Sequence, residues 1–205
     1  MAGLFVTFEG IDRSGKTTQA RMLVDALRDE AVAVREPGGT EVGERLRDLL
    51  KDPAVQISPE TEALLFAAAR AELVAQVIRP ALEAGKVVVS DRFLDSSLAY
   101  QGIARGLGVE DVEQINSFAT AGLLPDLTFL LSIDLARAAE RAGQLDRFED
   151  EGDSLQKAVF DAYSELAAAD TQRWRIIDAD RPSHEVHAEV LAAVQQARQS
   201  AGARA

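Results

Sequence analysis

Residues 10–18 read Gly10-Ile11-Asp12-Arg13-Ser14-Gly15-Lys16-Thr17-Thr18 and match the pattern G-x-x-x-x-G-K-[ST]. Glycines in such a loop let the backbone wrap closely around a phosphate group and direct its N–H groups inward. The lysine reaches the β- and γ-phosphates, the hydroxyl of Thr17 can ligate Mg²⁺, and the dipole of a helix beginning near Lys16 attracts the anion. The stretch predicts a nucleotide-binding loop. The alternative is a glycine-rich turn beside a solvated lysine.

The residues on both sides of this loop supply the context that the motif requires. Residues 4–8 are apolar and rich in β-formers, which predicts a buried parallel strand. After the loop, apolar residues recur at helical spacing at Ala20, Leu23, Val24 and Leu27. A strand, the loop and a helix in this order favour the phosphate-binding interpretation.

Strand and helix patterns alternate along the rest of the chain. Further strands are predicted over residues 31–34, 87–89, 127–133 and 174–177. Helices are predicted over residues 42–50, 98–104, 109–121 and 182–197. A long helix should begin at Pro59 with Ser58 as its N-cap, kink in its last turn at Pro80 and end at Gly85. This alternation predicts an α/β fold with a five-stranded parallel sheet flanked by helices.

The length and composition bound the organisation of the chain. Its 205 residues, 47% of them hydrophobic, supply enough apolar material for one well-buried core. No internal repeat or Gly/Ser-rich linker divides it, so we expect a single domain over residues 1–205. The small and polar tail, residues 199–205, is expected to fray.

The charge and residue usage exclude several classes of function. Lys and Arg number 22 against 34 Asp and Glu, so the net charge is −12, which disfavours binding to nucleic acid or to an anionic membrane. The chain has no cysteine and only two histidines, which excludes disulfides, Cys-ligated zinc and thiol nucleophiles. It shows no signal-peptide pattern and no apolar run of about 18 residues. We therefore expect a soluble, cytoplasmic protein.

Other large classes of phosphate-loop protein do not fit. A GTPase needs an Asn-Lys-x-Asp motif, but Asn116 is the only asparagine and is followed by Ser117 and Phe118. Motors and helicases are normally longer. The small kinases remain.

Several further motifs follow the loop in a fixed order. They are Arg35-Glu36-Pro37-Gly38-Gly39-Thr40, Leu65-Phe66-Ala67-Ala68-Ala69-Arg70, Asp91-Arg92-Phe93, Ala99-Tyr100-Gln101-Gly102, Pro125-Asp126-Leu127-Thr128, Leu145-Asp146-Arg147-Phe148-Glu149 and Ile177-Asp178-Ala179. Together with Phe8-Glu9-Gly10-Ile11-Asp12 they cover residues 3–177, and this stretch resembles the thymidylate kinase family. The resemblance implies a three-layer P-loop NTPase fold with a short lid, about residues 141–152. It also implies transfer of the γ-phosphoryl group of ATP to dTMP, giving dTDP for dTTP biosynthesis, by a cytoplasmic homodimer.

The resemblance implies a set of site residues. For ATP they are Gly10, Ile11, Asp12, Arg13, Ser14, Gly15, Lys16, Thr17 and Thr18. For dTMP they are Asp12, Arg35, Pro37, Phe66, Arg70, Arg92, Ser97, Tyr100 and Gln101. The catalytic set is Lys16, Arg13, Arg92, Asp12, Arg141 and Arg147, and Mg²⁺ is held by Thr17 and Asp91, partly through water.

Two of these positions can also be argued from the residues themselves. Asp91 ends an all-valine strand at the carboxyl edge, where ligands bind in parallel sheets, so it can hold Mg²⁺ or simply cap the next helix. Phe66 and Arg70 lie four residues apart and share a helix face. Spacing alone favours Phe66 in the core and Arg70 in solvent, whereas the resemblance implies stacking on thymine and donation to its O4.

The other acceptor residues have implied roles with simpler alternatives. Asp12 meets the sugar 3′-hydroxyl of dTMP, or binds loop N–H groups. Arg35 lies near the acceptor phosphate, or forms a surface pair with Glu36. Tyr100 crowds the space of a ribose 2′-hydroxyl, or simply packs.

The arginines leave one assignment open. Members of the family place an auxiliary catalytic arginine either in the phosphate loop or in the lid, and this chain has Arg13 in the first and Arg141 and Arg147 in the second. We favour Arg13, because it is fixed next to Lys16. The lid, which is a charged surface loop in the simpler interpretation, would close over the phosphates and exclude water.

Two alternative functions stay open from the sequence. One is a kinase for another nucleoside or nucleotide. The other is an inactive phosphate-loop module that binds a nucleotide without turnover, although Lys16, Thr17, Asp91 and Arg92 are all present. For the favoured function we expect in-line phosphoryl transfer without a general base, because the acceptor is already an anionic phosphate.

Overall fold

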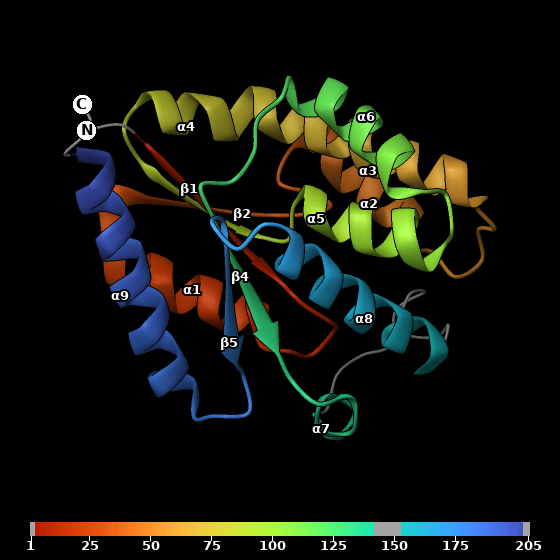
Figure 1. Ribbon diagram of the computed structural model, residues 1–205. Helices are drawn as coiled ribbons and strands as arrows, with labels where there is room; N and C mark the ends of the chain where they lie inside the picture. The colour runs from red at the N-terminus through yellow and green to blue at the C-terminus, as the bar shows by residue number, and fades with distance from the viewer. Residues whose placement is uncertain (1–2, 142–152, 203–205) are drawn as a thin grey trace.

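The strands lie side by side in one parallel sheet, with β1 in the middle (Figure 1). The structure is a computed structural model that describes residues 3–141 and 153–202. Within these residues the five strands are β1 (Leu4–Glu9), β2 (Ala31–Arg35), β3 (Val87–Asp91), β4 (Leu127–Ser132) and β5 (Trp174–Asp178), in the order β2-β3-β1-β4-β5. The predicted fold class is confirmed.

The register brings functional positions together at one edge of the sheet. Phe8 of β1 and Arg35 of β2 both pair with Asp91 of β3, so all three strands end at the same level. The chain passes from β1 to one side of the sheet for β2 and β3 and to the other side for β4 and β5. In open parallel sheets, ligands bind at the carboxyl ends of the strands beside such a switch point.

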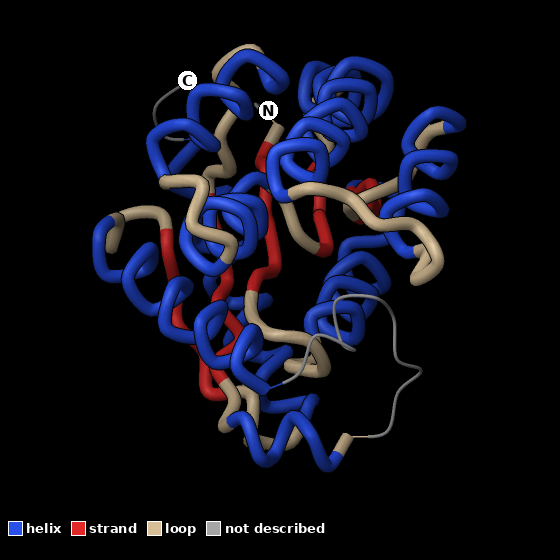
Figure 2. Tube along the Cα trace, turned by 90° about the vertical axis from the view of Figure 1, so that its right-hand side faces the viewer, coloured by secondary structure: helices blue, strands red, loops and turns tan. Residues whose placement is uncertain are grey.

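Helices cover both faces of the sheet, with the strands between them (Figure 2). The helix α1 (Lys16–Leu27) packs against α9 (Ser183–Gly202) on one face. The elements α3 (Pro59–Leu73), α6 (Val109–Thr120) and α8 (Asp153–Ala169) belong to the other layer (Figure 1). Shorter elements complete the described chain: η1 (Arg28–Glu30), α2 (Glu41–Lys51), η2 (Val74–Ile78), α4 (Arg79–Glu83), α5 (Leu94–Ser97), η3 (Leu98–Ala104) and α7 (Leu135–Glu140).

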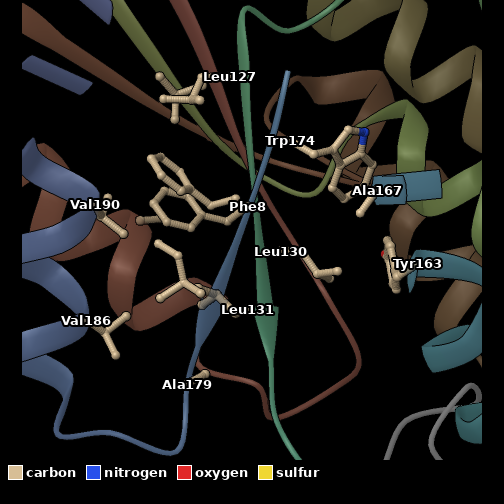
Figure 3. Close-up of a cluster of buried hydrophobic side chains, with 14 of the residues drawn as sticks. Phe8, Leu127, Leu130, Leu131, Tyr163, Ala167, Trp174, Ala179, Val186 and Val190 are labelled. Carbon is tan, nitrogen blue, oxygen red and sulfur yellow. The ribbon is translucent and has the colours of Figure 1, made fainter. Parts of the chain in front are cut away.

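Strand alternation divides the core between these two layers. Phe8 and Leu131 point toward Val186 and Val190 of α9, whereas Leu130 points to the opposite side, where Tyr163 and Ala167 of α8 lie (Figure 3). Because side chains alternate along a strand, Phe5, Thr7 and Glu9 share the face of β1 opposite to that of Phe8.

On the second face an aromatic contact joins β1 to the segment after β3. Phe5 meets Phe93 edge to face, with ring centroids 4.8 Å apart, and both are fully buried with Leu73 and Ile78. Full burial of such side chains contributes about 1.5–3 kcal/mol each. This cluster fixes the backbone immediately after Asp91, where the site residues begin.

Most predicted elements are confirmed, and two predicted helical stretches differ in their helix type. The oxygen of Ser58 accepts from the N–H of Thr61, which confirms the N-cap. The predicted long helix is interrupted by the π-helical segment η2 just before Pro80, which has no N–H to donate. The predicted helix over residues 98–104 is likewise a π-helix, η3, preceded by the unpredicted α5.

Two helices and the end of a third were not anticipated. The helices α7 and α8 lie where no helix was predicted. The last helix continues through Gly202, and residues 203–205 lie outside the described part, so the fraying expected for residues 199–205 stays a prediction. Among the helices of the described residues, none is both long and apolar enough to cross a membrane.

Candidate active site

A cleft of about 350 Å³ opens at the carboxyl ends of the central strands. The sequence-predicted residues that line it are Asp12, Arg13, Lys16, Thr17, Arg35, Pro37, Phe66, Arg70, Asp91, Arg92, Ser97, Tyr100 and Gln101. Four lining residues were not predicted: Glu36, Arg47, Lys51 and Ser96. The structure thus brings together all nine residues that the resemblance implied for dTMP.

The phosphate loop is held by glycine geometry at its start. Gly10 has φ +138°, and a Cβ there would lie 2.7 Å from the carbonyl oxygen of Leu131, so no other residue fits without strain. Lys16 begins α1 and donates from Nζ to the carbonyl of Ile11 at 2.7 Å. Burial lowers the pKa of Lys16 to about 8, and the charge of Arg92 acts in the same direction. The side chain of Lys16 therefore lies back over its own loop. A bound anion there would offset the positive charge of the amine.

Thr17 and Asp91 form the polar pair at the inner end of the cleft. The hydroxyl of Thr17 donates to Oδ2 of Asp91 at 2.5 Å, which joins the start of α1 to the end of β3. Both side chains offer an oxygen atom as a metal ligand, and oxygen is the ligand type that Mg²⁺ prefers. No group of three or more His, Cys, Asp or Glu side chains suited to a metal occurs in the described ranges. This donor set fits an ion that takes one or two protein oxygens and completes its shell with phosphate and water.

Arg92 holds its side chain over the cleft from a strained backbone. Its φ is +72°, in the left-handed region that non-glycine residues rarely adopt, and its N–H donates to the carbonyl of Phe8 at 3.0 Å. The guanidinium donates to the side chains of Asp12, Ser96 and Tyr163. Such strain costs about 1–3 kcal/mol and is typical of functional positions.

Asp12 receives hydrogen bonds from three directions. Arg92 donates to Oδ1, while Tyr100 and Gln156 donate to Oδ2 at 3.3 and 3.1 Å. Burial alone would raise the pKa of Asp12, but the charges of Arg92 and Lys16 outweigh it and lower the pKa to about 2. Asp12 is therefore an anion at the mouth of a cationic loop.

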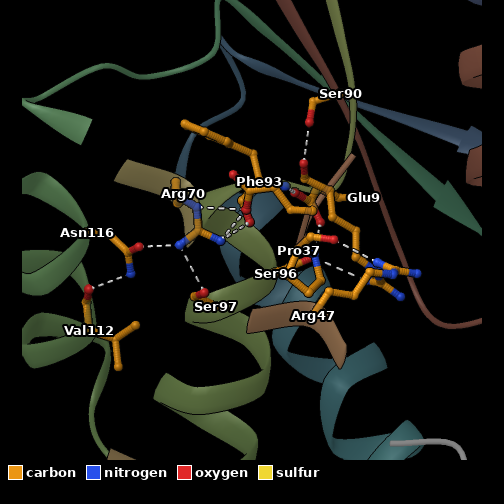
Figure 4. A network of polar contacts seen from close by, with 12 residues as sticks. Glu9, Pro37, Arg47, Arg70, Ser90, Phe93, Ser96, Ser97, Val112 and Asn116 are labelled. Carbon is orange, nitrogen blue, oxygen red and sulfur yellow. Dashed lines mark hydrogen bonds and ion pairs between the residues drawn. The ribbon is translucent and has the colours of Figure 1, made fainter. Parts of the chain in front are cut away.

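Behind Arg92 lies a carboxylate that the sequence analysis gave no role. Glu9 is fully buried and accepts from the N–H of Phe93 at 2.8 Å and from the hydroxyl of Ser96 at 2.6 Å (Figure 4). It also accepts from the hydroxyl of Tyr163 at 2.8 Å. Burial raises the pKa of Glu9 to about 7, and the charge of Asp95 adds to this. The two hydroxyls also accept from Arg92, so Glu9 reaches the arginine through them.

Arg70 is enclosed rather than solvated. Its side chain is 1% exposed. Its guanidinium donates five hydrogen bonds, two to Glu36, one each to Ser97 and Asn116, and one to the carbonyl of Phe93 (Figure 4). A guanidinium has five N–H donors, so all are used. The expectation from spacing alone, Arg70 in solvent, is wrong. A contact from Arg70 to a base requires giving up one of these bonds.

Arg35, at the end of β2, is a further cation at the cleft. Arg35 donates to the carbonyl of Pro37 at 3.1 Å and pairs with Glu44 at 2.9 Å. The alternative surface pair with Glu36 is wrong, because Glu36 pairs with the buried Arg70 instead. Arg47 of α2 also donates to the carbonyl of Pro37, at 2.8 Å, and holds this loop against the helix.

The wall opposite the loop carries the candidate base and sugar contacts. Phe66 is half-buried and packs on the core from α3. Tyr100 and Gln101 come from η3 and Ser97 from the end of α5, and all three line the cleft. The guanidinium of Arg92 lies 5.3 Å from the ring centre of Tyr100.

The expected lid is only partly described. Arg141 donates to the carbonyls of Arg13 and Ala179 at 3.0 and 2.9 Å, and so bridges the phosphate loop and the end of β5. Arg147 and the rest of the lid, residues 142–152, lie outside the described residues. The segment after β5 forms a turn. Arg181 of this turn pairs with Glu189 of α9 and does not line the cleft.

Of Glu9, Tyr163 and Gln156, which were not predicted, only Glu9 carried a signal in the sequence. Glu9 lies inside a quoted motif, and a charged residue at the end of an otherwise apolar strand is itself a signal of function. Tyr163 and Gln156 lie on α8, whose start follows the undescribed segment, and no local pattern marked them.

Comparisons with known proteins agree with this geometry. A family model described as thymidylate kinase matches residues 8–190. The thymidylate kinase of Pelotomaculum thermopropionicum is 48% identical over 204 residues, covering 96% of this chain and 94% of the relative. That of Deinococcus radiodurans is 48% identical over 200 residues, covering 95% and 97%. The crystal structure of thymidylate kinase from Ehrlichia chaffeensis superimposes with a TM-score of 0.77 at 32% identity, covering 95% of this chain and 99% of that one.

Proposed function

The chain belongs to the thymidylate kinase family, and we propose from this premise how its cleft transfers the γ-phosphoryl group of ATP to dTMP. The observation that carries the assignment is the convergence of Lys16, Thr17, Asp91 and Arg92 on one cleft at the strand ends. A module that only binds a nucleotide has no need of this complete set. The enzyme is a phosphotransferase, and dTDP and ADP are its products.

The phosphate loop is the proposed ATP site. Backbone N–H groups of residues 10–18 and the N-terminus of α1 would surround the β- and γ-phosphates. Lys16 would exchange its contact with the carbonyl of Ile11 for phosphate oxygen. The incoming negative charge favours the protonated amine, which raises the lowered pKa again.

Thr17 and Asp91 are the proposed residues for Mg²⁺. Thr17 would give up its hydrogen bond to Asp91 and bind the ion directly, and Asp91 would bind it partly through water. When bound, the ion would supply positive charge that offsets the charge of the phosphates.

The acceptor phosphate would lie among the cleft cations. Arg13, Arg35 and Arg92 line the cleft together with Lys16. They concentrate positive charge locally in a chain whose net charge is −12, so net charge is the wrong scale for judging this site. We propose that Arg13 stabilises the transferring group. Arg141 holds the backbone of Arg13 and Arg147 belongs to the lid.

The base and sugar sites occupy the opposite wall. Phe66 offers a flat ring for thymine, and Arg70, Ser97 and Gln101 surround it with polar groups. Tyr100, whose hydroxyl donates to Asp12, would leave no room for a ribose 2′-hydroxyl. Asp12 would accept from the 3′-hydroxyl of dTMP. No general base is required, because the attacking oxygen belongs to a phosphate.

We also propose a cytoplasmic homodimer in which the whole chain acts as one kinase domain. Exposed apolar side chains support an interface on the layer of α3 and α6, which pack together. Phe118 of α6 is 92% exposed, Leu64 of α3 is 55% exposed, and Leu124 just after α6 is 58% exposed. Apolar groups that gather on a surface are typical of contact with another chain, here a second copy.

A coupled assay of ADP release tests the proposed function. With ATP and Mg²⁺, dTMP should be turned over faster than dCMP or thymidine. Faster turnover of either of these would overturn the acceptor assignment and favour another nucleoside or nucleotide kinase. Binding of ATP without turnover of any acceptor would favour the inactive module.

A further inference from the structure

Glu62 is a buried carboxylate that the proposed mechanism does not use. It lies on α3, one turn before Phe66 and two turns before Arg70, so the three share a face of the helix. Its side chain is 1% exposed. A charged group is almost never buried this deeply unless hydrogen bonds hold it for a purpose.

The side chains of Gln101, in η3, and of Arg105, directly after η3, donate hydrogen bonds to this carboxylate. Nε2 of Gln101 donates to Oε1 of Glu62 at 2.9 Å. Arg105 donates from Nε to the same oxygen and from Nη2 to the other, both at 3.3 Å. Glu62 therefore lies between a cation, which offsets the cost of burying its charge, and the amide of a residue that lines the cleft.

The chemistry of this contact fixes which way the amide points. A carboxylate beside an arginine offers only acceptor oxygens, so Gln101 must present its NH₂ group to Glu62. The carbonyl Oε1 of Gln101 accepts no hydrogen bond from the described residues and remains available at the cleft wall. A primary amide has one N–H on the side of its oxygen and one on the far side, so with the far one donated to Glu62 the near one would lie beside Oε1.

We propose that Glu62 is a positioning residue for base selection, because it holds Gln101 in the one orientation that matches thymine. This rests on the proposed function, in which Gln101 contacts the base. In this orientation the exposed edge of the amide offers an acceptor, Oε1, beside a donor, the second N–H. Thymine offers the complementary pair, the donor N3–H beside the acceptor O4.

Cytosine presents the reverse order on the same edge. It has an acceptor at N3 and a donor at its 4-amino group. A glutamine that is free to rotate its amide by half a turn would pair with either base. Glu62 forbids that rotation, since it would turn Oε1 toward the carboxylate and place two acceptors against each other. Glu62 of α3 thus disfavours cytosine indirectly, through its hydrogen bond to Gln101, the residue that contacts the base.

The test is Glu62→Gln, which keeps the shape but lets the amide of Gln101 point either way. The kcat/KM values of dTMP, dUMP and dCMP are measured on one preparation. The ratio of dTMP to dCMP should fall by about ten- to a hundredfold, the discrimination of a bidentate pair. The ratio of dTMP to dUMP should stay within about twofold, because thymine and uracil share the same edge. Glu60→Gln, an exposed change on the same helix, is the matched control.

Two results would overturn the proposal. One is an unchanged ratio of dTMP to dCMP. The other is an equal fall in both ratios, which would indicate general damage to the pocket. Ratios between substrates do not depend on the folded fraction of the preparation. If Glu62→Gln does not fold, as judged by circular dichroism, Glu62→Asp withdraws the carboxylate from Gln101 while keeping a charge for Arg105, and the same two ratios decide. Failure of the native chain to phosphorylate dTMP would instead reject the proposed function.

Discussion

Glu9 and Tyr163 share a hydrogen bond of 2.8 Å although 154 residues separate them in the chain. The bond joins the end of β1 to the middle of α8. The same tyrosine hydroxyl accepts from Nη1 of Arg92 at 3.1 Å. A buried carboxylate thus orients, through one hydroxyl group, the arginine that is proposed to bind the phosphates.

Tyr163→Phe should weaken substrate binding more than it weakens the fold. The change removes one partner of Arg92 and keeps the buried ring. A hydrogen bond of this kind is worth about 1 kcal/mol, so the KM for dTMP should rise roughly fivefold. Steady-state kinetics measures this. Ser164→Ala, an exposed hydroxyl on the same helix, should leave KM unchanged.

Glu9→Gln should alter how stability depends on pH. The pKa of Glu9 is raised from 4.5 to about 7 in the folded chain, first by burial. The folded state therefore holds this proton more tightly than the unfolded state does, and the contribution of Glu9 to stability falls as pH rises from about 4.5 to about 7. The variant has no proton to lose at this position. Its stability relative to the native chain should therefore increase as the pH rises from 5 to 8.

Urea unfolding at several pH values measures this difference. Near pH 5 the two proteins should unfold at similar urea concentrations, since a protonated carboxyl and an amide are alike in shape and neutral. A gap that stays constant from pH 5 to pH 8 contradicts the assignment. Glu165→Gln, which removes an exposed carboxylate from α8, is the matched control.

Local patterns predicted the parts of this site that lie where a strand ends. The phosphate loop and the pair Asp91-Arg92 follow apolar strands directly, and strand order in a parallel sheet places such residues at one edge. Glycine at position 10 and the cap at Ser58 are also local requirements that the sequence states by itself.

The rest depends on contacts between distant segments. The sequence motif around Arg70 does not reveal that Glu36, Ser97 and Asn116 enclose its guanidinium, because the partners come from three other segments. The sequence predicted a helix over residues 98–104 but not its π-helical form, in which residues 98–102 are all buried. Whether a charged side chain is buried can be predicted only when the residues that surround it in the fold are known.

Glu36→Ala should destabilise the fold strongly. It leaves the guanidinium of Arg70 buried without its anion. Removing one partner of a buried pair costs about 3–5 kcal/mol. Chemical denaturation measures the loss. Glu41→Ala, which breaks the exposed pair with Arg45, should cost no more than about 1 kcal/mol, and a similar loss in both variants would contradict the role given to Glu36.

Phe118→Glu should convert a dimer to a monomer. The side chain is almost fully exposed on α6, so a charge there has little effect within one chain but would be buried against a second copy. Light scattering coupled to size-exclusion chromatography measures the mass. Glu113→Gln, another α6 change on an exposed residue, provides the control, and a native chain that is already monomeric sinks the proposal.

Lys16→Ala should abolish turnover while the fold persists. The amine is the buried cation of the phosphate loop, and among the described residues it donates to Ile11 and Ser14, both inside that loop. Its removal leaves the transferring phosphoryl group without the charge that the loop is built around. We expect kcat to fall by at least about a hundredfold, as when other preorganised groups that stabilise a transition state are removed. Lys157→Ala, an exposed lysine on α8, should leave kcat unchanged. Near-normal kcat in Lys16→Ala would show that residues 10–18 are a turn rather than the site of ATP.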